Sequence, residues 1–286
     1  FVFVVLKKGI IRMLKSFLRP MPAALLLAAS LLTGCASTTQ GGAIGANRSQ
    51  LLLVSEAEMA QSAQQYYAQQ NAQARAKGQL ITSGAEYERV HTIMRRIVPQ
   101  VAHFRADALN WKWQLVLINQ PEINAHVMPG GKVTFYTGII RQLKLSNDEI
   151  AAIMGHEMAH ALREHSREKA SVQQASGLAI SLGAKMLGVN QGQMDLIGMG
   201  KKLALDLPFS RSMESEADAL GLELAARAGY DPRAALTLWD KMAAASGDGG
   251  LTWLSTHPAP ASRKADMAAL MPKVMPLYEA TRGKKR

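Results

Sequence analysis

The chain has 286 residues, a single cysteine and a formal net charge of +11 at pH 7. One thiol cannot form an internal disulfide, which excludes a small disulfide-stapled scaffold. A chain with 48% hydrophobic and 19% charged residues is too apolar to be disordered, and its length allows one large domain or two modest ones. Aromatic residues make up only 6%, while methionine is plentiful, which favours helices packed through small and flexible side chains.

Residues 1–34 have the layout of a secretory signal. Their charged residues are all basic, and they precede an apolar run over 23–32 that is too short to span a bilayer. Met13 is a candidate start site. The sequence Leu32-Thr33-Gly34-Cys35 resembles the bacterial lipobox, in which cleavage before the cysteine exposes it for lipid attachment. The alternative is an uncleaved anchor with an incidental free cysteine.

A lipid on Cys35 would hold the mature protein on a membrane. Ala36 follows the cysteine, and by resemblance to Gram-negative lipoproteins this favours the outer membrane, facing the periplasm. Residues 35–50 are rich in Gly, Ser, Thr, Gln and Asn and predict a flexible tether. We expect the folded domain over 51–275 and a basic tail over 276–286. No basic motif is interleaved with aromatic residues, so we expect no nucleic-acid partner.

Capping-box pairs predict the helices, and alternation of apolar and polar residues predicts the strands. Helices are expected after the pairs Ser55/Glu58, Ser83/Glu86 and Ser146/Glu149. Strands are expected over 111–118, 124–128 and 132–136, the last two joined by a Pro-Gly-Gly turn. Residues 177–207 predict either a packed helical hairpin or a mobile cover over a cleft. The layout is therefore α+β, with a small antiparallel or mixed sheet beside a mainly helical body.

Residues 156–160 read His156-Glu157-Met158-Ala159-His160 and fall inside the helix that begins after Ser146. Residues four apart lie about one helical turn, roughly 6 Å, apart on one face, so the two imidazoles can bind one Zn²⁺. Glu157 can then act as general base on a water at that metal. The alternative is a pair of surface histidines, but the apolar flanks indicate a buried helix in which unpaired imidazoles are costly. We expect one Zn²⁺ per chain.

A catalytic zinc ion needs a third protein ligand and one open position. Glu164 lies on the same helical face as His156, but too far along the axis for both histidines to share an ion with it. His165 suggests the metzincin pattern. That pattern requires glycine and histidine where this chain has Arg163 and Ser166, so it is excluded.

A second helix around residues 211–218 offers a better third ligand. Glu214 and Asp218 are one turn apart and face the same way. Glu214 is the candidate zinc ligand, and Asp218 is the candidate acceptor that holds a ligand histidine in place. The alternative is an exposed acidic helix, and we assign Glu216 or Glu223 to such a face.

Segment 152–160, followed by the Glu214-x-x-x-Asp218 helix, resembles the HtpX-like, prenyl-protease-type zinc metallopeptidases. The resemblance covers about residues 51–263. Segment 124–131 resembles the family's strand and Pro-Gly-Gly turn beside the active cleft, and Thr256-His257-Pro258 followed by Arg263 resembles the His-Pro segment of its periplasmic members. With the lipobox, the chain most resembles the LoiP-type periplasmic lipoprotein proteases.

The resemblance implies a gluzincin-type fold. It also implies that the protein hydrolyses peptide bonds at a zinc ion held by His156, His160 and Glu214. His257 is expected either to donate a hydrogen bond to the oxyanion or to occupy the open zinc position at rest. A helix cap ahead of Pro258 is the alternative for His257. Arg263 is expected to steady that loop or to bind substrate carbonyls.

The strand beside the cleft is expected to pair with an extended substrate through the backbone, which reads main chain rather than sequence. It comprises Asn124, Ala125, His126, Val127 and Met128. His126 departs from relatives, which often carry an apolar or aromatic residue there, and it is expected to alter side-chain preference.

Two functional hypotheses remain at this stage. The first is a lipid-anchored periplasmic zinc endopeptidase that acts on unfolded or misassembled envelope proteins, with the outer-membrane assembly machinery as a candidate partner. The second is a non-catalytic assembly factor or chaperone with a structural zinc, in which His257 would be a permanent fourth ligand.

Overall fold

The computed structural model describes residues 35–186, 209–245, 252–258 and 262–283, with the side chains of helix α7 described as far as residue 179. The expected signal over 1–34 and most of the expected hairpin or cover over 177–207 lie outside the described residues. Among the described residues, no helix is long and apolar enough to cross a bilayer.

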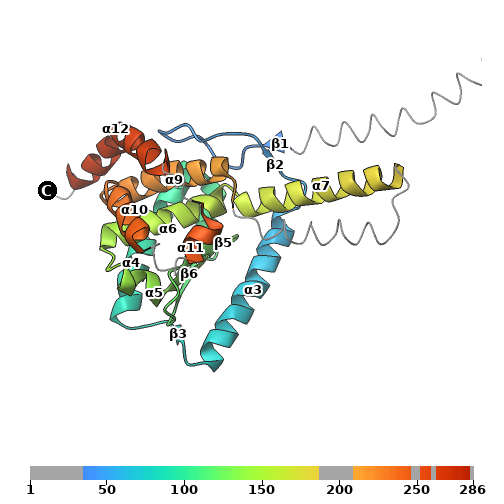
Figure 1. Ribbon diagram of the computed structural model, residues 1–286. Helices are drawn as coiled ribbons and strands as arrows, with labels where there is room; N and C mark the ends of the chain where they lie inside the picture. The colour runs from blue at the N-terminus through green and yellow to red at the C-terminus, as the bar shows by residue number, and fades with distance from the viewer. Residues whose placement is uncertain (1–34, 187–208, 246–251, 259–261, 284–286) are drawn as a thin grey trace, which may run out of the picture.

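Helices make up most of the described residues and flank a small four-stranded sheet, and two further short strands pair separately (Figure 1). The strands are β1 (Cys35–Ala36), β2 (Gln50–Leu51), β3 (Leu80–Ile81), β4 (Gln114–Ile118), β5 (Ala125–Met128) and β6 (Lys132–Tyr136). The helices are α3 (Glu56–Ala76), α4 (Ala85–Ile97), α5 (Thr137–Gln142), α6 (Asn147–Leu162), α7 (His165–Met186), α9 (Arg211–Arg227), α10 (Ala234–Ala245), α11 (Thr252–Thr256) and α12 (Ser262–Gly283), with 3-10 turns at Val98–His103 and Ala106–Asn110. The predicted α+β class is confirmed.

The main sheet is mixed and has the strand order β3-β4-β6-β5. Strand β4 runs parallel to β6, whereas β5 and β6 form an antiparallel hairpin with His126 opposite Thr134. Gly130 and Gly131 close that hairpin with φ values of 75° and 79°, a left-handed backbone that favours glycine. Strand β5 is therefore an edge strand, and its alternate residues Ala125 and Val127 are buried in the core.

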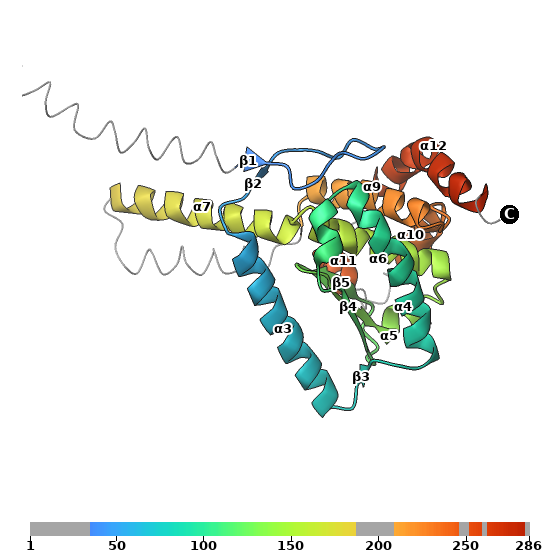
Figure 2. The same cartoon turned by 180° about the vertical axis from the view of Figure 1, so that it is seen from behind.

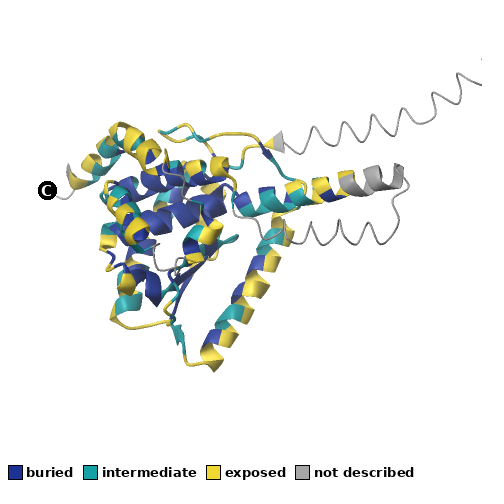
Figure 3. Ribbon diagram, in the orientation of Figure 1, coloured by how far each residue is buried: buried dark blue, intermediate teal, exposed yellow. Residues whose placement is uncertain are grey.

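Helix α6 lies at the centre of the molecule, packed against α4, α9, α10 and β5 (Figures 1 and 2). Its capping box forms as predicted, since the Ser146 hydroxyl accepts from the Glu149 N–H and the Glu149 carboxylate accepts from the Ser146 N–H. Every residue from Glu149 to Leu162 is buried, so the helix is the darkest segment in Figure 3. A helix enclosed on all sides keeps water from whatever its polar side chains hold.

Two glycines allow α6 and α9 to cross at close range. A Cβ on Gly155 would lie 2.6 Å from the Gly221 carbonyl oxygen, and a Cβ on Gly221 would lie 2.6 Å from the His156 nitrogen. Because the obstructing atoms belong to the backbone, only glycine permits this approach. Gly221 is about two helical turns beyond Glu214, so the crossing brings the acidic face of α9 to the histidine face of α6.

The structure corrects the prediction of a flexible tether over 35–50, because this segment packs on the domain. Strand β1 pairs with β2, the Gln40 N–H donates to the Phe104 carbonyl at 2.8 Å, and the Ala43 N–H donates to a Glu223 oxygen at 2.9 Å. Glu223 is fully buried, which also corrects its assignment to an exposed acidic face. Composition reports local flexibility, but it does not reveal a partner on a distant helix.

Two boundaries also differ from the predictions. The capping box at Ser83 does not form, because the N-cap is Gly84 with a φ of 96°, and Glu86 pairs instead with Arg141 at 2.7 Å. The expected basic tail begins inside α12, which runs on to Gly283 with Val274 buried. The basic residues near this end of the sequence indicate its charge, but they do not predict that it is helical.

Candidate metal centre

Four buried side chains meet beside the second half of α6, namely His156, His160, Glu214 and His257. Each offers one ligand atom, and these atoms all lie within 4.8 Å of one another. The two Nε2 atoms of His156 and His160 are 3.1 Å apart, and the Glu214 oxygens lie 3.6 Å and 3.3 Å from them. The structure thus brings together the three residues that the sequence predicts as ligands.

The donor set fits a divalent metal ion. Glu214 Oε1 and His257 Nε2 are buried, and neither has a hydrogen-bond partner among the described residues. A buried oxygen or nitrogen without a partner is costly, and burial raises the pKa of Glu214 to about 7, against the opposing effect of His156. A bound cation would remove this cost, and two imidazoles with one carboxylate are ligands that zinc prefers.

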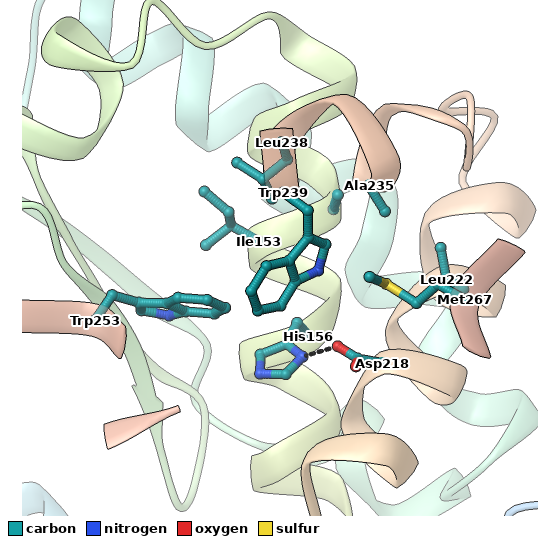
Figure 4. Close-up of a pocket in the computed structure, with 10 residues that line it drawn as sticks. Ile153, His156, Asp218, Leu222, Ala235, Leu238, Trp239, Trp253 and Met267 are labelled. Carbon is teal, nitrogen blue, oxygen red and sulfur yellow. Dashed lines mark ion pairs between the residues drawn. The ribbon is translucent and has the colours of Figure 1, made fainter. Parts of the chain in front are cut away.

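Asp218 and Arg263 support the first histidine from behind. Asp218 Oδ1 lies 3.0 Å from His156 Nδ1, which leaves Nε2 directed at the metal position (Figure 4). Arg263 donates two hydrogen bonds to Asp218, each 2.7 Å long. Although burial opposes ionisation, Arg263 and His156 lower the pKa of Asp218. Arg263 Nη1 also lies 2.7 Å from Glu214 Oε2. Arg263 therefore pairs with both carboxylates, and its role is not limited to steadying the loop before it.

The second histidine is supported by two residues that sequence analysis did not assign to the site. His165 Nδ1 lies 2.9 Å from His160 Nδ1, and His165 Nε2 lies 3.0 Å from Glu216 Oε2. Glu164 adopts a φ of 50°, which ends α6 and turns the chain so that His165 lies beside His160. The prediction of an exposed Glu216 is therefore wrong, since only 11% of its side chain is exposed. The five-residue spacing matches no helical period, so no local pattern predicts this pair.

Glu157 has an environment suited to proton transfer. The Trp253 indole N–H donates to Glu157 Oε1 at 2.7 Å, and His257 Nε2 lies 3.5 Å from the same oxygen. Burial raises the pKa of Glu157 to about 7, although His156 and Trp253 oppose the shift. A carboxylate whose pKa lies near neutrality can both take and return a proton at that pH.

The orientation of His257 discriminates between its two expected roles. Its Nδ1 lies 3.1 Å from the Trp253 carbonyl oxygen, which can only accept, and 2.9 Å from the Thr256 hydroxyl, which itself donates to that carbonyl. Both neighbours favour a proton on Nδ1. Burial lowers the pKa of His257 well below its usual range and favours the neutral ring. With this tautomer, Nε2 presents a lone pair to the metal position, which favours the role of a resting fourth ligand.

Helix α11 lies next to the residue pair that precedes the edge strand, and beside the metal position. Its Trp253 N–H donates to the Ile123 carbonyl at 3.1 Å, and the Trp253 ring stacks on His257 at 4.6 Å. Figure 4 shows Trp253, Trp239 and Leu238 around His156, where they enclose a cavity of about 20 Å³ with Ile153, Leu222 and Met267. That volume suffices for about one water molecule.

Residues 85–270 match Peptidase family M48. They contain all the side chains described at this centre. The chain belongs to Peptidase family M48.

Relatives with curated names agree with this membership. Over 166 residues the chain is 42% identical to the mitochondrial metalloendopeptidase OMA1 of Schizosaccharomyces pombe, a match that covers 57% of this chain and 48% of that protein. It is 38% identical to the OMA1 of Arabidopsis thaliana, over 54% of this chain and 31% of that protein. It is 29% identical to the beta-barrel assembly-enhancing protease of Escherichia coli, over 56% and 35%. The chain thus spans about half or less of the length of these relatives.

Membership of M48 supports the expected enzyme class, a metalloprotease with the His-Glu-x-x-His motif. The centre gathers His156, Glu157, His160, Glu214, Asp218, His257 and Arg263. Strand β5, which lies in the predicted substrate strand, packs against α6. The side chain of Cys35, the predicted lipidation site, is not among those described. The pairs missing from the sequence prediction are His165 with Glu216, and Trp253 with Glu157.

Proposed function

We propose that this chain is a zinc metalloendopeptidase. One observation carries the proposal: His156, His160 and Glu214 converge from two helices with Glu157 beside them, and the fourth position is faced by His257, which follows the separate short helix α11. A structural zinc site has four permanent ligands, whereas a catalytic site has three and an exchangeable position.

The residues of the centre divide the work of peptide hydrolysis. His156, His160 and Glu214 would hold the ion, which when bound would polarise the scissile carbonyl and make a water more acidic. Glu157 takes the proton from the attacking water and returns it to the departing amine. Asp218 keeps the proton of His156 on Nδ1, which leaves Nε2 free to ligate.

The edge strand supports a preference for extended substrates. Tyr136 N–H donates to the Asn124 carbonyl at 3.1 Å, and from that pair the antiparallel register alternates. The backbone N–H and C=O of His126 therefore bond to β6, whereas those of Ala125 and Val127 point away from it. The Ala125 N–H donates to Asn124 Oδ1 at 2.9 Å, and the Val127 N–H faces the Glu157 carboxylate. An added peptide strand would pair with the backbone groups of Ala125 and Val127. Unfolded chains present such a strand, and folded ones do not.

We further propose that the substrates are misfolded or misassembled envelope proteins, cut at the outer membrane from the periplasmic side. The lipobox at Cys35 supports lipid anchoring there and kinship with the LoiP-type lipoprotein proteases. The similarity to a beta-barrel assembly-enhancing protease supports the outer-membrane assembly machinery as a partner.

The alternative is a non-catalytic assembly factor with a structural metal, and His257 is the observation that favours it. Its Nε2 lies in the same group as the three ligands, so the described arrangement offers four donors. The two functions differ in whether His257 leaves that position.

Replacement of the general base tests the enzyme directly. Glu157→Gln keeps the size of the side chain and one acceptor for Trp253, so the variant is expected to bind zinc like the wild type. Its hydrolysis of casein is expected to fall at least about 100-fold, since general-base catalysis contributes about that much or more. Glu88→Gln, a change at an exposed carboxylate of α4, is the control. Casein cleavage by Glu157→Gln at the wild-type rate would contradict the proposal.

A further inference from the structure

Arg48 connects the segment after Cys35 to two acidic side chains near the end of α6. Its Nη1 lies 2.6 Å from Glu168 Oε1, and its Nε lies 2.9 Å from Glu216 Oε1. The Arg48 carbonyl in turn accepts a hydrogen bond of 2.8 Å from Arg163 Nη2. No step of peptide hydrolysis described above uses this segment.

A chain of three contacts leads from Arg48 to the metal position. His160 faces the metal through Nε2, so its proton is on Nδ1, which lies 2.9 Å from His165 Nδ1. His165 Nδ1 accepts the hydrogen bond from the Nδ1–H of His160, so the proton of His165 lies on its Nε2. That N–H donates to Glu216 at 3.0 Å. A carboxylate thus fixes the tautomer of His160 through one intervening ring.

Glu216 can do this only while its carboxylate is held in place. His165, Arg163 and Arg48 all contact that carboxylate. Arg163 alone does not satisfy the carboxylate, because its contacts of 3.1 Å and 3.3 Å both go to Oε2, the oxygen that also accepts from His165. Arg48 contacts the other oxygen, Oε1, and so fixes the rotation of the carboxylate.

The segment is itself anchored on both sides of Arg48. The buried Arg163 donates to Ser37 Oγ at 3.0 Å and to Thr39 Oγ1 at 3.2 Å. The buried Gln50 side chain donates to the Arg163 carbonyl at 2.6 Å and to Glu168 at 2.8 Å. Arg48 is therefore presented from a fixed backbone, although 38% of its side chain is exposed.

We infer that residues 37–50 form a strap that completes the metal centre, and that Arg48 is a positioning residue for His160, acting through Glu216 and His165. Outer partners of a ligand histidine typically change metal affinity about 10-fold to 100-fold. Arg48 is partly exposed, and two residues separate it from the ligand His160. We therefore expect its effect on metal affinity to lie near the lower limit of that range. The inference concerns metal binding, so loss of the proposed peptide hydrolysis would leave it standing.

Zinc affinity of the purified full-length protein, measured by competition with a coloured chelator, tests the strap. Arg48→Ala is expected to bind zinc about tenfold more weakly than the wild type. Arg48→Lys is expected to fall between them, because an ammonium group cannot contact two carboxylates as a planar fork does. Arg141→Ala removes a comparable exposed arginine, paired with Glu86 at 2.7 Å, and is expected to bind zinc normally.

Two further readouts separate positioning from a general loss of stability. The visible spectrum of the Co²⁺-loaded protein is expected to change in Arg48→Ala and not in Arg141→Ala, while the two metal-free variants melt at similar temperatures. Arg48→Gln, which keeps a polar but shorter and uncharged side chain, serves if Arg48→Ala does not fold. Adding Arg48→Ala to Glu216→Gln is expected to cause no further loss of affinity. The inference is overturned if Arg48→Ala and Arg48→Gln bind zinc as tightly as the wild type, or if the double variant loses another factor of about ten.

Discussion

The two ligand histidines are oriented by different routes. His156 has a carboxylate beside its Nδ1, and that carboxylate receives two hydrogen bonds from Arg263. His160 reaches its carboxylate only through His165. Both arrangements pair the acidic group with a cation and hold the ring proton of the ligand histidine on Nδ1, which leaves its Nε2 directed at the metal position.

The depressed pKa of Glu216 predicts how the metal-free protein responds to acid. A carboxyl group whose pKa falls from 4.5 to about 2 on folding stabilises the native state above pH 4.5. This contribution is lost as the pH falls from 4.5 towards 2. We therefore expect the free energy of unfolding of the wild type, measured with urea, to fall more steeply over that interval than that of Glu216→Gln. Equal slopes for the two proteins would contradict the prediction.

Spacing makes some of these residues predictable and leaves others hidden. His156, Glu157 and His160 follow from one turn of helix, and the pairing of Glu214 with Asp218 follows from another. His165 and Glu216 depend on the turn at Glu164 and on the crossing of two helices, which no local pattern encodes. Trp253 reaches Glu157 across 96 positions of the chain, so its role can be found only in three dimensions.

At the scale of elements, the crossing of α6 and α9 determines whether a third ligand reaches the metal. In an exposed helix, Gly→Ala would stabilise by about 1 kcal/mol. At Gly221 the added Cβ would lie 2.6 Å from the His156 nitrogen, so we expect Gly221→Ala to destabilise by about 1–3 kcal/mol, as overpacking does.

Urea unfolding and zinc titration of Gly221→Ala check both consequences of that overlap. Zinc affinity is expected to fall because the helices must move apart and take Glu214 away from the histidines. Ala226→Gly, a change at a buried site further along α9, is the control for stability without a shift in the crossing. A Gly221→Ala protein more stable than the wild type would show that the helices do not meet as described.

We expect helix α11 and His257, the residue that follows it, to control access to the centre. The Trp253 N–H of α11 bonds to Ile123, two residues before the edge strand, its indole bonds to the general base, and His257 faces the metal position. We expect His257→Ala to retain zinc and to hydrolyse casein at least as fast as the wild type, since the remaining ligands are the three of a catalytic site. Ser255→Ala, on the exposed side of the same helix, is expected to behave as the wild type.

The alternative function predicts the reverse for the His257→Ala variant. If His257 were a permanent ligand, its removal would release most of the zinc and would not raise proteolysis. Zinc content and casein hydrolysis measured on the same preparation separate the two outcomes.

At the scale of the whole molecule, the α+β class, the hairpin at residues 124–136 and the central helix were accessible from sequence. Alternation, the Pro-Gly-Gly turn and the Ser146/Glu149 pair are local signals that survive in the fold. The strap over 37–50 was not accessible, because its low-complexity composition suits a tether and its partners Glu216 and Glu223 lie on α9. The parallel pairing of β4 with β6 likewise depends on contacts between distant segments.

The central claim is that two helices hold one divalent ion, and the metal content of a Glu214 variant tests this claim most directly. After saturation with zinc and removal of the excess, the wild type is expected to retain one ion per chain, and Glu214→Ala is expected to retain little. Glu86→Ala, an acidic residue of α4 paired with Arg141, is expected to match the wild type. Equal zinc content in wild type and Glu214→Ala would contradict the assignment of the third ligand, and with it the proposed centre.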